Sequence, residues 1–342
     1  MTGCTSMTPL TACWSRPANN AINMTWFAAI SLIISTIISS LGVWANGWFP
    51  FAGTTLEAER GRVLGVFESV IPWPDQELGH LPAAPAKPAG PKISFDLPAD
   101  NGVVYDCADQ NLAFAKSPDR DWPIASITKL FSAYTFLDFN PGWDKSYVLS
   151  EQDRRDGGKI YLFTGDKVTA KDLFYFSLVG SDNTATAALV HATGLSEAEF
   201  VKKMNEKVKA LGLTSTKFQD AVGLSDGNIS TAREVAQFAK LALANPDISR
   251  ATLTKKYEFT TAQGKKKTIA STDELLAVFP ENGVKIMGGK TGFINSAGYC
   301  LVSRFKNHDN KEIITVVLGA DSDQARFSLT KRLVELYYGG EQ

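Results

Sequence analysis

Strand-like segments stand at both ends of residues 93–342, and helix-like segments lie between them. A hairpin is predicted at 101–115, and the last strands are predicted across 284–320. Chain ends that pair in one sheet predict an α+β domain: an antiparallel sheet flanked by helices, with an inserted helical subdomain at about 139–250. A site is expected where sheet and subdomain meet, because pockets favour such junctions.

The individual elements follow from the spacing of apolar residues. Helices are predicted at 126–138, 171–180, 183–194, 198–212, 231–243 and 324–338. Strands are predicted at 256–263 and 265–272, as a hairpin, and at 284–293, 298–305 and 312–320.

The N-terminal part of the chain differs in charge from the rest. Residues 1–55 carry one charged side chain, Arg16, although Asp, Glu, Lys and Arg make up 21% of the chain. The segment 26–44 has no charge and no proline, and a run of about 20 apolar residues spans a bilayer. We therefore predict a short tail at 1–24 and a transmembrane anchor at 25–45. A cleaved signal peptide is the alternative.

A proline-rich linker is predicted at 46–92. Its last part has prolines at positions 82, 85, 88 and 91. Proline fixes φ and removes a hydrogen-bond donor, so this spacing is typical of an extended, semi-rigid spacer. The globular domain is expected to begin near Ile93.

The charge balance and the scarcity of metal ligands argue against several classes of protein. The chain has 35 basic and 36 acidic residues, a net charge of -1, which does not favour nucleic-acid binding. Its 4 cysteines are too few for a disulfide scaffold. The histidines, His80, His191 and His308, lie far apart without metal-ligand spacing, so neither a metal nor a cofactor is expected.

Three short motifs occur in order along the predicted domain. An S-x-x-K motif at 126–129 opens a predicted helix, S-D-N at 181–183 falls between two helices, and K-T-G at 290–292 falls on a strand. Each motif alone occurs by chance in many proteins. The ordered trio is the signature of penicillin-binding proteins and class A β-lactamases.

The residue types in these motifs suit nucleophilic catalysis. Ser126 and Lys129 share one helix face, so the lysine nitrogen can reach the hydroxyl and, when neutral, take its proton. Burial or a nearby cation such as Lys290 would keep the lysine neutral. The helix N-terminus would stabilise a developing oxyanion. Ser181 would relay a proton to the leaving group, while Asn183 would hold the substrate backbone.

The segment at 290–292 adds a surface for a peptide. A strand with a free backbone edge can pair with an extended, antiparallel peptide. We therefore expect the substrate to lie along this strand.

Residues 93–340 resemble the serine-type D-alanyl-D-alanine carboxypeptidases, the low-molecular-weight penicillin-binding proteins. The resemblance extends beyond the three motifs to KFQDAVGLSDGNISTARE at 217–234, AGYCLV at 297–302 and GADSDQARFSLTKRLVELYY at 319–338. It implies a β-lactamase/transpeptidase-like fold and an enzyme that removes terminal D-alanine from peptidoglycan stem peptides ending in D-Ala-D-Ala. β-Lactams are the implied inhibitors. The implied location is outside the cell membrane, tethered through the N-terminal segment, or secreted if that segment is cleaved.

The resemblance also implies a role for individual residues. Ser126 would be the acylated nucleophile and Lys129 its base. Backbone N–H groups of Ser126 and Phe293 would form the oxyanion hole, and Thr291 and Arg326 would hold the terminal carboxylate. The predicted catalytic residues are Ser126, Lys129, Ser181, Asn183 and Lys290. The predicted substrate-binding residues are Thr291, Gly292, Phe293 and Arg326.

The chain departs from the family pattern at two places near the third motif. Ile294 stands where the family usually has threonine, which changes a wall of the site. Ser-Thr-Asp at 271–273 replaces a more usual Asn-Thr-Asn.

Three alternatives remain beside the carboxypeptidase. A D,D-endopeptidase uses the same residues. A class A β-lactamase needs a glutamate in an E-x-x-L-N segment between the second and third motifs, and Glu234 lies instead in a predicted helix. A non-enzymatic wall-binding module is disfavoured because all three motifs are intact.

Overall fold

The structure, a computed structural model, describes residues 93–158 and 160–339. The predicted tail at 1–24, the apolar segment at 25–45 and the linker at 46–92 lie outside the described residues. Within the described part, none of the helices combines the length and apolar character needed to cross a bilayer.

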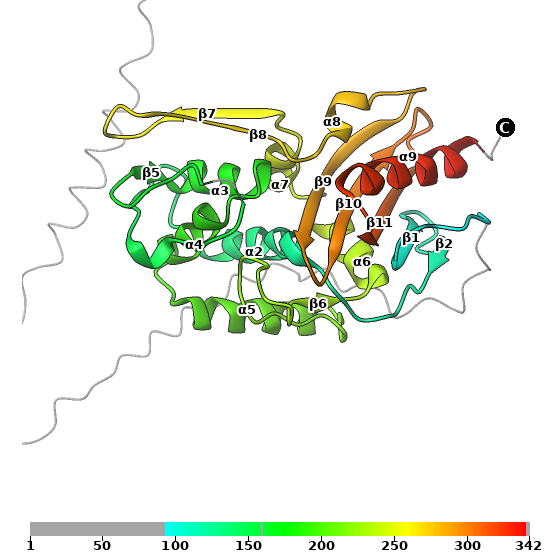
Figure 1. Cartoon of the computed structure of the whole chain (residues 1–342), viewed down its shortest axis with the longest axis horizontal. Helices are drawn as coiled ribbons and strands as arrows, with labels where there is room; N and C mark the ends of the chain where they lie inside the picture. Colours follow the sequence, from blue (N-terminus) through cyan, green and yellow to red (C-terminus); the bar gives the residue numbers. More distant parts are fainter. Residues whose placement is uncertain (1–92, 159, 340–342) are drawn as a thin grey trace, which may run out of the picture. The chain divides into compact units, whose positions relative to one another are not determined.

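The main sheet of the domain has five antiparallel strands and lies toward the right in Figure 1. In spatial order its strands are β2 (Leu112–Lys116), β1 (Asn101–Asp106), β11 (Glu312–Ala320), β10 (Gly298–Lys306) and β9 (Lys285–Ile294). The first hairpin therefore pairs with the last strand in one sheet, as predicted. In this pairing Val103 lies opposite Val316. The strand that carries the K-T-G motif, β9, is an edge strand of this sheet.

Both faces of the sheet are covered. Ile313 and Val317 of β11 pack in one apolar cluster with α9 (Asp323–Gly339). Ile314 and Val316 pack in the other cluster, with buried residues of the helical part. This alternation follows from the two-residue period of a strand, so the expected α+β fold is confirmed.

The helical part follows the predicted segments. Its main helices are α2 (Thr128–Phe136), α3 (Ala170–Val179), α4 (Asn183–Ala192) and α5 (Glu197–Ala210). Three single turns accompany them: η1 (Ala125–Ile127), η2 (Leu137–Phe139) and η3 (Glu151–Asp153). Polar side chains cap the starts: Thr169, Asp182 and Ser196 accept backbone N–H groups of α3, α4 and α5.

Several short elements were not predicted from the sequence. They are α7 (Pro246–Thr252), α8 (Leu275–Val278), and the pairs of β3 (Trp122–Pro123) with β6 (Ile229–Ser230) and of β4 (Ser146–Val148) with β5 (Lys167–Thr169). The predicted hairpin of β7 (Lys256–Thr260) and β8 (Lys266–Ala270) forms its own two-stranded sheet and packs on α3 (Figure 1).

One helix packs elsewhere than its place in the chain predicts. The range expected for the inserted subdomain includes α6 (Ala232–Ala242), but α6 packs on β1, β10 and β11 (Figure 1). Its buried face carries the small residues Ala232, Ala236 and Ala239, which let the helix lie close to the sheet. Apolar spacing identifies a buried face and does not identify its partner.

Candidate active site

The predicted nucleophile lies in a tight turn between strand and helix. Ser126 is in η1, directly before α2, and Ala125 before it has a φ of +46°. A Cβ atom on Gly292 would lie 2.9 Å from the Ile124 carbonyl oxygen and 3.2 Å from the Ser126 nitrogen. One on Gly223 would lie 2.2 Å from the Ala125 oxygen. Glycine at both positions therefore lets β9 and the loop at 220–228 approach the nucleophile's backbone.

Lys129 is completely buried beside the predicted nucleophile. Its Nζ lies 2.8 Å from Ser126 Oγ, and it donates to Asn183 Oδ1 at 2.8 Å and to the Val222 carbonyl at 2.7 Å. Burial lowers the pKa of Lys129 to about 7, although nearby carboxylates act in the opposite direction. A neutral amine is therefore available to Ser126 near neutral pH.

A second lysine serves the S-D-N motif. Lys290 on β9 is also buried, and its Nζ donates to Ser181 Oγ at 2.8 Å and to the Thr291 carbonyl at 2.9 Å. Burial, followed by the charge of Lys129, holds the pKa of Lys290 well below its usual range. Ser181 has a φ of +57°, a conformation that turns the chain sharply before α4. The hydrogen bond between Lys290 and Ser181 therefore joins the S-D-N motif directly to the K-T-G motif.

The amide of Asn183 is held from the opposite side. Its Nδ2 donates to the carbonyls of Asp156 and Gly157, at 3.2 and 3.1 Å, so Oδ1 is left facing Lys129. Asp182 caps α4, and burial raises the pKa of this carboxyl to about 6. These contacts orient Asn183 without using the oxygen that meets the lysine.

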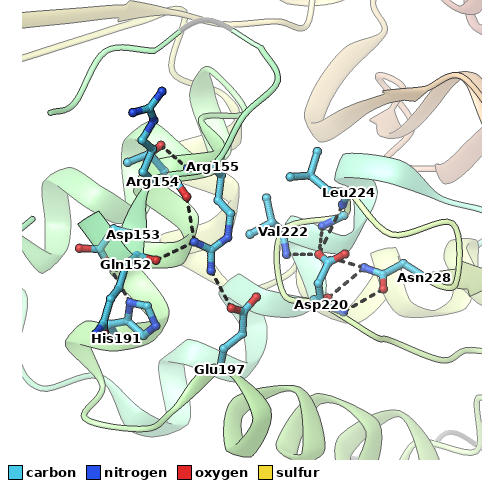
Figure 2. A network of polar contacts seen from close by, with 12 residues as sticks. Gln152, Asp153, Arg154, Arg155, His191, Glu197, Asp220, Val222, Leu224 and Asn228 are labelled. Atoms are coloured by element: carbon cyan, nitrogen blue, oxygen red, sulfur yellow. Dashed lines mark hydrogen bonds and ion pairs between the residues drawn. The ribbon is translucent and has the colours of Figure 1, made fainter. Parts of the chain in front are cut away.

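The loop that holds Asn183 is itself anchored to the neighbouring helices, as Figure 2 shows. Arg155 donates to Glu197 Oε2 at 2.6 Å. His191 Nδ1 lies 2.6 Å from Asp153 Oδ1 (Figure 2). The second contact gives His191 a structural role in α4.

The predicted substrate-binding residues gather along β9. Thr291 Oγ1 lies 2.6 Å from Thr272 Oγ1. Phe293 is 46% exposed, and its ring centroid lies 4.3 Å from that of Tyr299. An exposed aromatic ring therefore stands at the end of the strand next to the nucleophile.

The side chain of Arg326 donates hydrogen bonds to main-chain carbonyls of β9 and β10. Its Nη1 donates to the Gly292 carbonyl at 3.0 Å and to the Cys300 carbonyl at 3.4 Å, and the guanidinium also pairs with Asp323. The side chain of Asp323 is 56% exposed, whereas that of Arg326 is 8% exposed.

The structure brings all nine predicted site residues together around β9, η1 and the start of α4. Sequence analysis missed the Val222 carbonyl and the Thr272 hydroxyl, both of which contact predicted site residues. A main-chain carbonyl has no residue signature. Thr272 lies between the two positions of the 271–273 segment that depart from the family pattern, and it keeps the threonine of that pattern, so the resemblance was its only signal.

Comparison with known proteins decides between the enzyme classes that carry these motifs. The family described as D-alanyl-D-alanine carboxypeptidase, Peptidase_S11, matches residues 86–322. The chain belongs to this family. It is a serine hydrolase, and the resemblance inferred from the motifs is confirmed.

Relatives and solved structures support the same assignment. A D-alanyl-D-alanine endopeptidase of Haemophilus influenzae is 35% identical over 249 residues, which are 71% of this chain and 83% of the relative. The carboxypeptidase DacF of Bacillus subtilis is 29% identical, covering 76% and 68%. Penicillin-binding protein D2 of Listeria monocytogenes, in its cefotaxime-bound form, is 29% identical, with a TM-score of 0.62 and coverage of 72% and 99%.

Glu234 has a structural role in this fold. Its carboxylate accepts hydrogen bonds from the Ser215 amide at 2.9 Å and the Thr216 hydroxyl at 2.6 Å. Thr231 caps the same helix, α6. These contacts, with the family assignment, disfavour the β-lactamase alternative, in which a glutamate would have to position a hydrolytic water.

Proposed function

We propose that this chain is a serine D,D-carboxypeptidase that acts on peptidoglycan stem peptides ending in D-Ala-D-Ala. The observation that carries the proposal is the buried Lys129, whose Nζ lies 2.8 Å from Ser126 Oγ. A desolvated amine with a lowered pKa activates a serine hydroxyl, and the fold supplies no other base at this distance among the described residues.

The reaction would proceed in two halves. Ser126 Oγ attacks the carbonyl of the penultimate D-alanine while Lys129 takes the hydroxyl proton, and backbone N–H groups of Ser126 and Phe293 stabilise the oxyanion. The C–N bond then breaks, and the proton that Lys129 accepted passes through Ser181, which Lys290 orients, to the departing amine of D-alanine. Water hydrolyses the resulting ester and releases the shortened peptide.

The terminal carboxylate of the substrate would lie at Thr291 and Arg326. Lys290 adds positive charge beside them when it is protonated. Asp323, the exposed partner of the buried Arg326, would have to give way to a substrate carboxylate at that guanidinium. Gly292 lets the peptide and the nucleophile approach the same edge of β9.

A D,D-endopeptidase is the second candidate, because relatives named as endopeptidases are among the most similar proteins. The two activities are separated by their products. Free D-alanine from a pentapeptide supports the carboxypeptidase. Conversion of a cross-linked dimer to monomers, without free D-alanine, supports the endopeptidase.

The proposed location is outside the cytoplasmic membrane, where the substrate lies. The uncharged segment at 26–44 would tether the domain, or would be removed as a signal peptide. Comparing the mass of the mature protein with that of the full chain distinguishes the two.

Labelling with a fluorescent penicillin tests the nucleophile. Wild type should be labelled covalently, because the lactam carbonyl takes the place of the substrate carbonyl. Ser126→Ala should not be labelled. Ser328→Ala, an exposed serine of α9, is the matched control and should behave as wild type. Labelling that survives Ser126→Ala would sink the assignment.

A further inference from the structure

A single carboxylate organises the loop that meets Lys129. Asp220 Oδ1 accepts the backbone N–H groups of Val222 at 2.7 Å, of Gly223, and of Leu224 at 3.4 Å (Figure 2). Its Oδ2 accepts the N–H of Ser225 at 2.6 Å. Four successive amides therefore converge on one side chain, which fixes the direction of the carbonyls between them.

The same loop is attached to the helix that carries the predicted nucleophile and base. The Asn228 carbonyl accepts the Ile124 amide at 3.0 Å, and Asn228 Nδ2 donates to Thr128 Oγ1 at 3.2 Å. Ser132 Oγ donates to the Ala221 carbonyl at 2.5 Å. These hydrogen bonds fix the position of the loop relative to α2.

The position of the loop determines where the lone pair of Lys129 points. A neutral lysine amine has two hydrogens and one lone pair. Asn183 Oδ1 and the Val222 carbonyl are both acceptors, so they take the two hydrogens. The lone pair is then directed at Ser126 Oγ, 2.8 Å away, which is the direction needed to receive the hydroxyl proton.

We propose that Asp220 is a positioning residue for the base: its carboxylate fixes the loop backbone at Val222 and so holds the Val222 carbonyl on Lys129. Asp220 acts through Lys129 and does not touch the substrate. The inference rests on the proposed acyl-enzyme chemistry of Ser126, and it adds a residue outside the three motifs to that site.

The charges around Lys129 determine whether loss of the Asp220 charge raises or lowers the pKa of Lys129. Asp182 faces it from the start of α4, Asp220 from the loop, and Lys290 from β9. Burial lowers the pKa of Lys129 to about 7, and the two carboxylates oppose that shift. Loss of the Asp220 charge should therefore lower the pKa of Lys129 further.

The test is the pH dependence of penicillin acylation in the full chain carrying Asp220→Asn. Asparagine keeps one oxygen, but its NH₂ group then faces the Ser225 amide, donor against donor. We expect the rate constant at high pH to fall by about tenfold to a hundredfold, because the base is misplaced. The midpoint of the rising limb should move to lower pH.

Two further variants separate geometry from charge. Asp220→Glu keeps the charge on a longer side chain, so the plateau rate should fall while the midpoint stays near that of wild type. Asp220→Ser removes the charge but keeps a small acceptor, and it replaces D220N in the comparison if asparagine prevents folding. Asp226→Asn, an exposed carboxylate of the same loop bonded to Ser296, is the control and should change neither quantity.

The outcomes are distinct. If wild type is not labelled at all, the proposed function fails. If wild type is labelled, and a folded D220N or Asp220→Ser keeps both its plateau rate and its midpoint, the positioning role of Asp220 is wrong. A loss of the same size in Asp226→Asn would also overturn it, since that loss would report only the charge of the loop.

Discussion

Single buried side chains set the electrostatics behind the third motif. Asp273 is 5% exposed, its Oδ1 accepts the Leu275 amide at 3.0 Å, and its Oδ2 has no hydrogen-bond partner. Burial raises the pKa of Asp273 to about 6, against the opposing charges of Lys290 and Arg326. This aspartate stands where the family usually has asparagine, so the chain carries an ionisable group at a position that disfavours charge.

Replacing Asp273 with asparagine should stabilise the protein above pH 6. The pKa of Asp273 is raised from 3.8 in the unfolded chain to about 6, so the folded state holds the proton more tightly. Stability is therefore lost as pH rises between these values, by about 2–3 kcal/mol in total. Asp273→Asn removes that loss, and urea unfolding at several pH values measures it.

The comparison has a clear control. Asp144→Asn removes one charge from an exposed residue elsewhere in the domain and should change stability little at any pH. An Asp273→Asn advantage as large at pH 4 as at pH 8 would show that packing, and not ionisation, is responsible.

At the scale of elements, the site depends on the close contact between β9 and η1. No side chain fits between them at Gly292, where a Cβ atom would meet the Ile124 carbonyl and the Ser126 amide. The motif glycine is therefore required by the approach of two backbones, which belong to segments more than a hundred residues apart. Periodicity in the sequence predicted both elements without predicting this contact.

Gly292→Ala should slow acylation without unfolding the protein. The methyl group forces β9 away from η1, so the substrate strand and the oxyanion donors lose their alignment. We expect penicillin acylation to slow by about tenfold to a hundredfold. Gly339→Ala, where a Cβ atom meets nothing within 4 Å, is the matched control. A normal acylation rate in a folded Gly292→Ala variant would contradict this account.

Over the whole molecule, aromatic packing joins the helix of the nucleophile to the sheet. Phe131 on α2 stacks on Phe238 of α6, with centroids 3.7 Å apart and an interplanar angle of 8°. Tyr134 meets the same Phe238 ring edge-on at 5.4 Å. Because α6 also packs on β1, β10 and β11, this cluster connects Ser126 and Lys129 with the central sheet.

Phe238→Ala should therefore weaken both stability and catalysis. The side chain is 1% exposed, and removing a buried phenylalanine costs about 3–5 kcal/mol. Urea unfolding measures the loss, and acylation by penicillin should slow because α2 loses its support. Phe163→Ala, where the ring is 57% exposed, should cost far less. Equal losses of unfolding free energy in the two variants would argue against a stabilising role of the aromatic cluster.

Much of the architecture was predicted from local patterns. The hairpin of β1 and β2, the helices of the inserted part and the strands β9 to β11 lie within a few residues of their predicted ranges. The two-residue strands β3 and β6 and the short helix α7 were missed, because two residues show no period and α7 is only seven residues long. The packing of α6 on the sheet was missed because an amphipathic helix shows which face is buried and not what covers it.

By itself, the sequence determined which chemical groups are available and in which order they occur: the serine, the two lysines, the S-D-N turn and the glycines. It also determined the elements that carry them, because helix and strand periods are local properties. Only the tertiary structure decided how these groups act. Burial lowers the pKa values of Lys129 and Lys290, and the Val222 carbonyl and Asp220 orient the base. Desolvation and hydrogen-bond direction depend on atoms brought together from distant segments, and no single stretch of sequence contains them.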